Sequence, residues 1–148
     1  MKTVKDLLQG KTANVWSISP KAKVFDALKF MSEKQIGALM VVDEKGQTTG
    51  IMSERDYARK VILLGKTSKE TAVEEIMTPV DHMFYVKPEH TVEECMILMT
   101  VKHIRHLPVC QEGKLLGLVS IGDAVKSIIS EKDALIEQLS NYIAGKYM

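Results

Sequence analysis

The stretch Gly50-Ile51-Met52-Ser53-Glu54-Arg55-Asp56 returns 67 residues later as Gly117-Leu118-Val119-Ser120-Ile121-Gly122-Asp123. Both copies read Gly-apolar-apolar-Ser-x-x-Asp, and both close a run of apolar residues. Self-similarity at a fixed spacing is the mark of a duplicated structural unit. The chain therefore consists of two copies of one unit, and the polar Ser-x-x-Asp pair falls where a strand is expected to pass into a helix.

The similarity extends upstream of this stretch. Six residues recur 68 positions later: Pro20, Val24, Met31, Ile36, Leu39 and Val41 match Pro88, Val92, Met99, Ile104, Leu107 and Val109. The spacing falls to 67 at Gly46 and Gly113, because the second copy has one residue fewer in its turn.

The apolar periodicity predicts the order strand, helix, strand, strand, helix in each copy. In the first copy we expect strands at 15–18, 39–42 and 48–52, with helices at 24–32 and 53–64. In the second we expect strands at 84–86, 107–110 and 115–119, with helices around 92–99 and at 121–129. A helical arm at 4–8 precedes the first copy, and 73–77 forms a helical turn that Thr78-Pro79 breaks.

A separate helix is expected at 131–147, where apolar residues share one face. They are Leu135, Ile136, Leu139, Tyr142 and Ile143. This stripe must bury against the chain's own body or against a second chain. We place the tail at or near a homodimer contact.

The size and composition of the chain argue against nucleic-acid binding and against a membrane-spanning protein. Each unit spans about 65 residues, and a domain of that size is marginal alone, so we expect the two units to pack together. A net charge of +1 argues against nucleic acid, because phosphate-backbone binding needs a basic footprint. No apolar run is long enough to span a membrane. Cys95 and Cys110 lack metal-site spacing, so we expect reduced, mostly buried thiols in a reducing compartment. The first six residues lack an apolar signal core, so we expect a cytoplasmic location.

The Ser-x-x-Asp pairs can be interpreted as helix caps or as ligand-binding groups, and the two roles do not exclude each other. Serine can cap a helix while the acidic residue three positions later bonds back to the cap amide. The same helix start offers free amides and positive charge to a phosphate, and the carboxylate can accept the two hydroxyls of a ribose. The recurrence of the pair at equivalent positions favours ligand binding.

The repeat resembles a tandem pair of CBS domains, the cystathionine-β-synthase type module, also called a Bateman module. The resemblance rests on Ser17-Ile18-Ser19-Pro20 and Tyr85-Val86-Lys87-Pro88, on 36–39 and 104–109, and on Glu75-Ile76-Met77-Thr78-Pro79. It implies a mixed α/β fold, α+β in class, with two repeats packed sheet to sheet about a pseudo-twofold axis plus a C-terminal helix. The implied domains are 1–72 with the N-terminal arm, 73–130, and 131–148 for the C-terminal helix.

The resemblance also implies clefts that bind adenosine-containing ligands such as AMP, ADP, ATP, NAD or S-adenosylmethionine. The motif aspartates, Asp56 and Asp123, would hold ribose hydroxyls, and Ser53 and Ser120 would lie near ribose or phosphate. The candidate residues are Ser17, Ile18, Ala38, Leu39, Ser53, Arg55, Asp56 and Thr78, then Tyr85, Val86, Arg105, His106, Leu107, Ser120 and Asp123.

The copies differ around the motif, so the two clefts are expected to be unequal. Arg55 lies inside the first motif, whereas the second copy has Arg105 and His106 where the first has Gly37 and Ala38. Arginine presents a rigid donor fork to phosphate, yet an exposed arginine on a helix is usually only solvated.

The sequence shows no nucleophile and base pair, and His103-x-x-His106 lacks further ligands for a metal. We therefore expect a non-catalytic regulatory module without a metal or catalytic cofactor, which signals to an unknown effector protein in trans. The alternative is a structural or dimerisation module with vestigial ligand clefts.

Overall fold

Each copy of the repeat folds around an antiparallel hairpin with a helix before it and a helix after it. The computed structural model describes residues 2–10, 15–129 and 133–145. The first copy contains β1 (Ser17–Ile18), α2 (Val24–Lys34), β2 (Ala38–Val42), β3 (Thr48–Ser53) and α3 (Glu54–Lys60). The second contains α4 (Val92–Lys102), β5 (His106–Gln111), β6 (Lys114–Ser120) and α5 (Ile121–Ile129).

Shorter elements surround the two hairpins. They are α1 (Val4–Gln9), the 3₁₀ turns η1 (Ile62–Leu64), η2 (Val73–Glu75) and η3 (Val80–His82), strand β4 (Thr78–Pro79) and the C-terminal helix α6 (Asp133–Ile143). The chain divides into two compact units. Residues 14–84 form the first-repeat unit, and residues 1–13 with 85–148 form the second-repeat unit.

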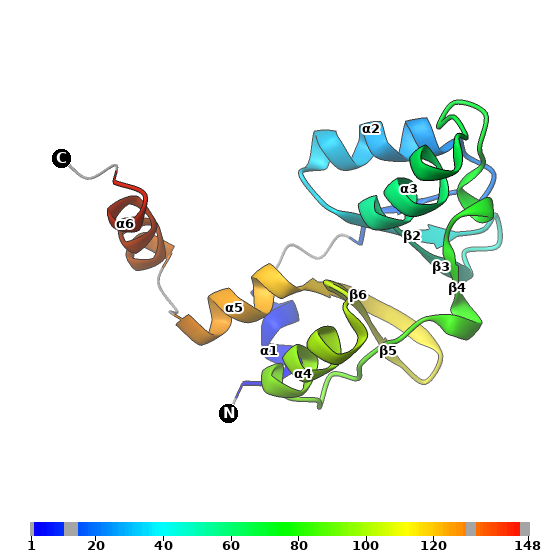
Figure 1. Ribbon diagram of the computed structural model, residues 1–148. Coiled ribbons are helices and arrows are strands. Elements are labelled where there is room, and N and C mark those ends of the chain that lie inside the picture. Colours follow the sequence, from blue (N-terminus) through cyan, green and yellow to red (C-terminus); the bar gives the residue numbers. More distant parts are fainter. Residues whose placement is uncertain (1, 11–14, 130–132, 146–148) are drawn as a thin grey trace. The chain divides into compact units, whose positions relative to one another are not determined.

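The first-repeat unit is built on a four-stranded sheet in the order β1-β2-β3-β4. β1 runs parallel to β2, and the other neighbouring strands are antiparallel. Helices α2 and α3 lie on one side of the β2–β3 hairpin (Figure 1). Three residues of α2 belong to a core made of Val24, Ala27, Met31, Leu39, Val41, Met52, Val61, Val73 and Ile76. Tyr57 of α3 is partly buried and packs against this core.

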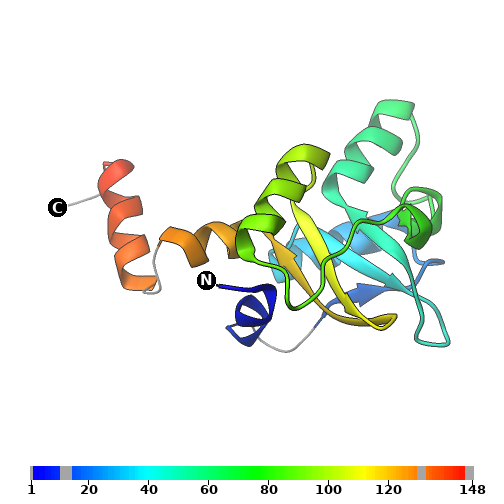
Figure 2. The same cartoon turned by 90° about the horizontal axis from the view of Figure 1, so that it is seen from below.

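The second-repeat unit is built on the β5–β6 hairpin, with α4 packed beside it (Figure 2). Its core repeats that of the first unit at most of the equivalent positions. The buried residues are Val4, Leu7, Val86, Val92, Cys95, Met99, Leu107, Val109, Val119 and Ala124.

Several expected elements are shorter in the structure than the sequence suggested. The strand expected at 15–18 covers only Ser17–Ile18, and the turn expected at 73–77 covers only Val73–Glu75. The strand expected at 84–86 reduces to a bridge in which Val86 pairs with Val109. In the first copy the Met40 N–H donates to the Trp16 carbonyl, but the equivalent residue, Pro108, has no N–H to donate. The pairing therefore begins only at Val86.

The helix expected at 53–64 also ends early. α3 stops at Lys60, and the chain tightens into the 3₁₀ turn η1, which Gly65 closes with a φ of 73°. The β-branched pair Val61-Ile62 disfavours a continued α-helix, and Val61 turns its side chain fully into the core.

The repeat also includes the two segments that precede the copies. Val4 and Lys5 donate N–H bonds to the carbonyls of His90 and Pro88, at 2.8 and 3.0 Å. Sixty-nine residues later, Val73 and Glu74 donate to Ala22 and Pro20, at 2.8 and 2.9 Å. These acceptors are equivalent residues of the two copies.

Each leading segment therefore completes the copy that it does not precede. The boundaries expected from the sequence group the N-terminal arm with the first copy, whereas α1 belongs to the second-repeat unit. The physical reason is burial, because Val4 and Leu7 fill the core of that unit.

The two motif glycines allow these segments to approach the hairpins closely. A Cβ atom at Gly50 would collide with the backbone carbonyl oxygen of Thr78 in β4. A Cβ atom at Gly117 would lie 2.6 Å from the Cδ2 atom of Leu8 in α1. The first obstacle is backbone, and the second is the end of a flexible side chain.

We predict that Gly50→Ala lowers the free energy of unfolding by about 1–3 kcal/mol, because β4 must move away from β3. Gly117→Ala should cost less than about 1 kcal/mol, since Leu8 can rotate and a strand glycine is itself unfavourable. Urea denaturation of the two variants checks the order, and an equal loss would contradict it.

Candidate functional site

The candidate residues of the first copy meet at one end of the sheet. Ala38 opens β2 and pairs with Ser53, the last residue of β3. Ser17 pairs with Met40, two residues inside β2, and Thr78 pairs with Ile51, two residues inside β3. One end of the sheet therefore holds the starts of β1, β2 and β4 together with the end of β3. Helix α3 begins at this end.

A reciprocal cap fixes the start of α3. The backbone N–H of Ser53 donates to Asp56 Oδ2 at 2.9 Å, and the Ser53 hydroxyl donates to the same oxygen at 3.1 Å. In return, the Asp56 N–H donates to Ser53 Oγ at 3.2 Å. The Glu54 N–H donates to the Gly37 carbonyl at 3.1 Å, which ties the helix start to the residue before β2.

The second copy repeats this junction. The Ser120 N–H donates to Asp123 Oδ2 at 2.8 Å, and the Asp123 N–H donates to Ser120 Oγ at 3.2 Å. His106 pairs with Ser120, and the Ile121 N–H donates to the Arg105 carbonyl at 2.8 Å. The capping interpretation of both Ser-x-x-Asp pairs is thus confirmed.

The remaining candidate residues of the second copy lie near the corresponding end of the β5–β6 hairpin. Leu107 pairs with Val119 and is fully buried, and Val86 lies beside β5. The preceding Tyr85 is 52% exposed. Leu39 is fully buried in the first copy, as Leu107 is in the second.

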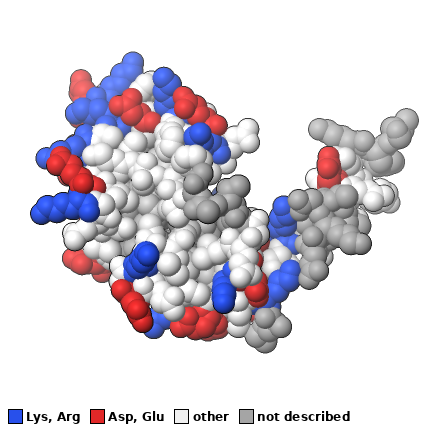
Figure 3. All heavy atoms as spheres, turned by 180° about the vertical axis from the view of Figure 1, so that it is seen from behind, with Lys and Arg blue, Asp and Glu red and all other residues white. Residues whose placement is uncertain are grey.

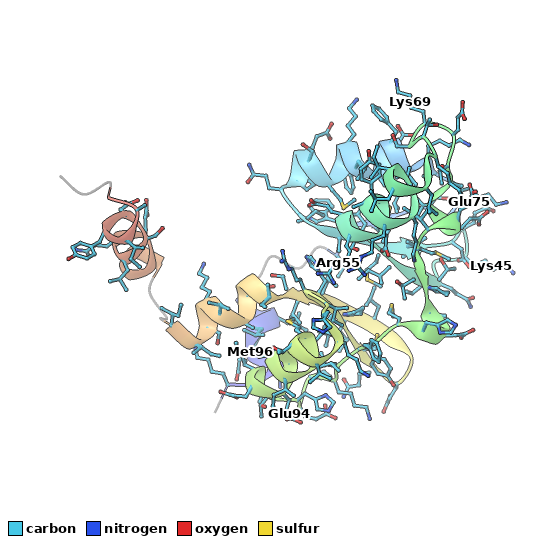
Figure 4. The ribbon with its side chains drawn as sticks, in the orientation of Figure 1. Lys45, Arg55, Lys69, Glu75, Glu94 and Met96 are labelled. Atoms are coloured by element: carbon cyan, nitrogen blue, oxygen red, sulfur yellow. The ribbon has the colours of Figure 1, made fainter. Side chains whose placement is uncertain are left out.

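The arginines occupy different places in the two copies. Arg55 lies in the first turn of α3 (Figure 4) and is partly buried. Arg105 precedes β5 and is exposed. The basic groups of the two copies therefore enter from opposite sides of the strand-to-helix junction, one from the helix and one from the strand.

Lys60 is a charged neighbour of Asp56 that the sequence analysis missed. Its ammonium lies 3.4 Å from Asp56 Oδ1 and donates to the Ile76 carbonyl at 3.0 Å. The spacing of four residues on α3 could have revealed the pair. At the equivalent position the second copy has Ser127, whose hydroxyl is buried and has no hydrogen-bond partner among the described residues.

Two concave surfaces lie in the first-repeat unit. One has a volume of about 370 Å³ and includes two candidate residues; its lining is Ser17, Ile18, Asp26, Lys29, Phe30 and Glu33. The other, about 660 Å³, lies between α2 and α3 and is lined by Leu28, Met31, Ser32, Gln35, Ile36, Gly37, Glu54, Tyr57 and Ala58. Neither of these two surfaces includes Ser53 or Asp56.

The cysteines are free thiols with a structural role. Cys95 is fully buried in α4, and Cys110 is partly buried in β5. Burial raises the pKa of Cys95 to about 11, with a smaller contribution from Glu94, and burial also raises the pKa of Cys110. Both thiols therefore stay protonated at neutral pH and are weak nucleophiles.

Three further features were sought among the described residues: a metal-binding cluster, a membrane-spanning helix and a basic surface. No cluster of three or more histidine, cysteine, aspartate or glutamate residues there could hold a metal ion. No helix there is both long and apolar enough to cross a membrane. On the face in Figure 3, basic and acidic side chains are interspersed and form no continuous basic surface.

Comparison with known proteins identifies the repeat. The family model described as "CBS domain" matches twice, at residues 4–62 and 73–134. The mitochondrial CBS domain-containing protein CBSX3 of Arabidopsis thaliana is 40% identical over 152 residues, which cover 98% of this chain and 73% of CBSX3.

Solved structures give the same result. A putative signal-transduction protein with CBS domains from Burkholderia ambifaria is 48% identical with a TM-score of 0.83, and the match covers 89% of this chain and 97% of that one. A hexameric CBS-CP12 protein from bloom-forming cyanobacteria is 33% identical with a TM-score of 0.72, over 92% of this chain and 75% of that one.

Proposed function

The chain belongs to the CBS domain family, and on that basis we propose that it is a non-catalytic sensor of adenosine-containing nucleotides. AMP, ADP, ATP and NAD are the candidate ligands, and they would bind at the strand-to-helix junction of each copy. Proteins with paired CBS domains are in general regulatory modules, which is consistent with the signal-transduction name of the Burkholderia relative.

The observation that carries the proposal is the orientation of the two motif carboxylates. In each copy the cap holds Oδ2 of the aspartate by a backbone N–H, which fixes the carboxylate at the helix start. A carboxylate held in place loses little entropy when a ribose diol binds it. The same helix start favours a phosphate through its amides and its positive dipole end.

The candidate residues have separate roles in this proposal. Asp56 and Asp123 accept the ribose hydroxyls, and Arg55 and Arg105 with His106 contact phosphate. The base lies against the opening strand and the start of the second strand, at Ser17, Ile18, Ala38 and Leu39 or at Tyr85, Val86, His106 and Leu107. Ser53, Ser120 and Thr78 complete the polar lining.

A nucleotide present at a hundred times its dissociation constant should stabilise the fold by about 2.7 kcal/mol and raise the melting temperature. Asp56→Asn and Asp123→Asn should each remove binding at one junction, because an amide cannot replace a carboxylate between two hydroxyl donors. Thermal denaturation and calorimetric titration with AMP, ADP, ATP and NAD measure both effects.

The chain offers a matched control for these variants. Thr3 and Asp6 form the same reciprocal cap at α1, with bonds of 2.9, 3.1 and 3.4 Å, and the bonds from Thr3 lower the pKa of Asp6. Asp6→Asn should weaken that cap and leave nucleotide binding unchanged. Failure of all four nucleotides to bind at millimolar concentration would refute the proposal.

The Lys60 ammonium should weaken diol binding at the first junction, because it competes for Asp56 Oδ1. We predict that Lys60→Met tightens binding of uncharged adenosine there by about two- to fivefold, the range of a partly exposed ion pair of up to about 1 kcal/mol. Arg59→Met removes the same charge one residue away and should have no such effect. Calorimetric titration in an Asp123→Asn background isolates the first junction.

The output of such a sensor requires an assembly or a partner that reads its state. A ligand shifts a conformational equilibrium only through different affinities for the two states. We propose that the chain acts in the cytoplasm as a homodimer and signals in trans to an effector protein. A structural or dimerisation module with vestigial sites is the alternative, and a stable dimer that binds none of the four nucleotides would favour it.

A further inference from the structure

A four-residue turn, Lys87-Pro88-Glu89-His90, attaches helix α1 to the rest of the second-repeat unit. The Pro88 carbonyl accepts a hydrogen bond from Lys5, and the His90 carbonyl accepts one from Val4. The His90 N–H donates to the Lys87 carbonyl at 3.1 Å and closes the turn. The attachment of α1 therefore depends on the shape of this turn.

The side chain of His90 closes the turn a second time. The Lys87 N–H donates to His90 Nδ1 at 2.8 Å. A backbone N–H can only donate, so Nδ1 must present its lone pair and the imidazole must be neutral. An imidazolium carries a proton on both ring nitrogens and cannot accept this bond. The turn thus contains a hydrogen bond that exists in only one protonation state of its histidine.

The equivalent turn of the first copy, residues 19–22, holds its own segment without a histidine. Ala22 occupies the position of His90, and its carbonyl accepts a hydrogen bond from Val73. The side-chain bond of that turn runs from the Lys21 N–H to the Ser19 hydroxyl at 3.2 Å. The fold therefore does not need an imidazole at this position, and the histidine gives one copy a titratable bond that the other lacks.

Charged side chains of both signs lie on the elements around His90. Carboxylates are carried by Glu89 of the turn, by Glu93 and Glu94 of α4 and by Asp6 of α1. Ammonium groups are carried by Lys87 of the turn, by Lys2 before α1 and by Lys5 within it. An imidazolium that has lost its bond to the Lys87 N–H can therefore turn toward acidic groups.

Glu94 is the acidic group on which the charge of His90 acts. Hydrogen bonds from the backbone and the side chain of Thr91 lower the pKa of Glu94, and the charge of His90 adds a smaller lowering. Glu94 therefore stays a carboxylate at a pH where a histidine gains its proton. This attraction draws a protonated His90 toward the start of α4 and away from the Lys87 N–H.

We propose that His90 is a pH-sensitive latch, which holds α1 on the second-repeat unit when its imidazole is neutral and loosens α1 when it is protonated. Histidine changes its charge between about pH 5 and pH 8, so the latch works close to neutral pH. The effect reaches the core, because Val4 is fully buried and Leu8 lies close to Gly117 of β6. The proposal does not depend on nucleotide binding.

Amide hydrogen exchange of the full chain tests the latch. The protection factors of the Val4 and Lys5 amides, which already correct for intrinsic exchange at each pH, should fall by about three- to tenfold between about pH 7.5 and about pH 5.5. This range corresponds to the loss of about one hydrogen bond. The Val73 and Glu74 amides make the equivalent bonds to the first turn, so their protection should not change.

Two substitutions separate the imidazole from the other titratable groups. His90→Gln supplies an acceptor that does not titrate, as glutamine does at the third position of a capping box, so the protection of Val4 and Lys5 should become independent of pH. His90→Ala introduces the residue of the first copy and should lower the protection of these two amides at both pH values. Circular dichroism verifies that both variants fold.

Three results would overturn the latch. The first is unchanged protection of Val4 and Lys5 across this pH range in the parent. The second is an equal fall in His90→Gln, which would assign the pH dependence to another group. The third is an equal fall at Val73 and Glu74, which would show a general loosening of the chain in place of a local release of α1.

Discussion

The reciprocal cap between serine and aspartate at the strand-to-helix junction is the interaction on which each copy of the repeat depends. It ends β3 at Ser53 and starts α3 there, and it does the same for β6 and α5 at Ser120. The junction lies beside the starts of the neighbouring strands. One local motif therefore sets the direction of the helix and places polar groups at that end of the sheet. The proposed ligand-binding role would use the same carboxylates that form the caps.

The two copies have diverged around this shared junction, and the differences are chemical. Asp56 shares its second oxygen with Lys60, which also holds the Ile76 carbonyl, whereas the second copy has a buried serine in place of that lysine. Lys29 and Glu33 of α2 are charged, whereas Ile97 and Val101 at the equivalent positions of α4 are exposed aliphatic residues. The two copies thus have similar junctions with different charged neighbours, and equivalent helices with different surface residues.

Much of the fold was predictable because its determinants are local. The apolar stripe of α2 and the turn at Gly46 are read directly from residue spacing, and the cap follows from the order of Ser53 and Asp56. The pairing of α1 with the second copy was not predictable, because it depends on hydrogen bonds to residues more than eighty positions away. The short pairing of the strand expected at 84–86 could have been predicted, because the sequence shows a proline without an N–H at position 108. Of the candidate site, the sequence identified the residues at each junction, but it did not show that Lys60 turns toward Asp56.

The central claim is that the two junctions bind nucleotides in addition to capping helices. Amide resonances of a ¹⁵N-labelled sample, followed during titration with AMP, test it most directly. The account predicts saturable shifts at residues 53–56, at residues 120–123 or at both, with no comparable change at Thr3–Asp6, which has the same cap. The absence of saturable shifts at both junctions, or equal shifts at all three caps, would contradict it.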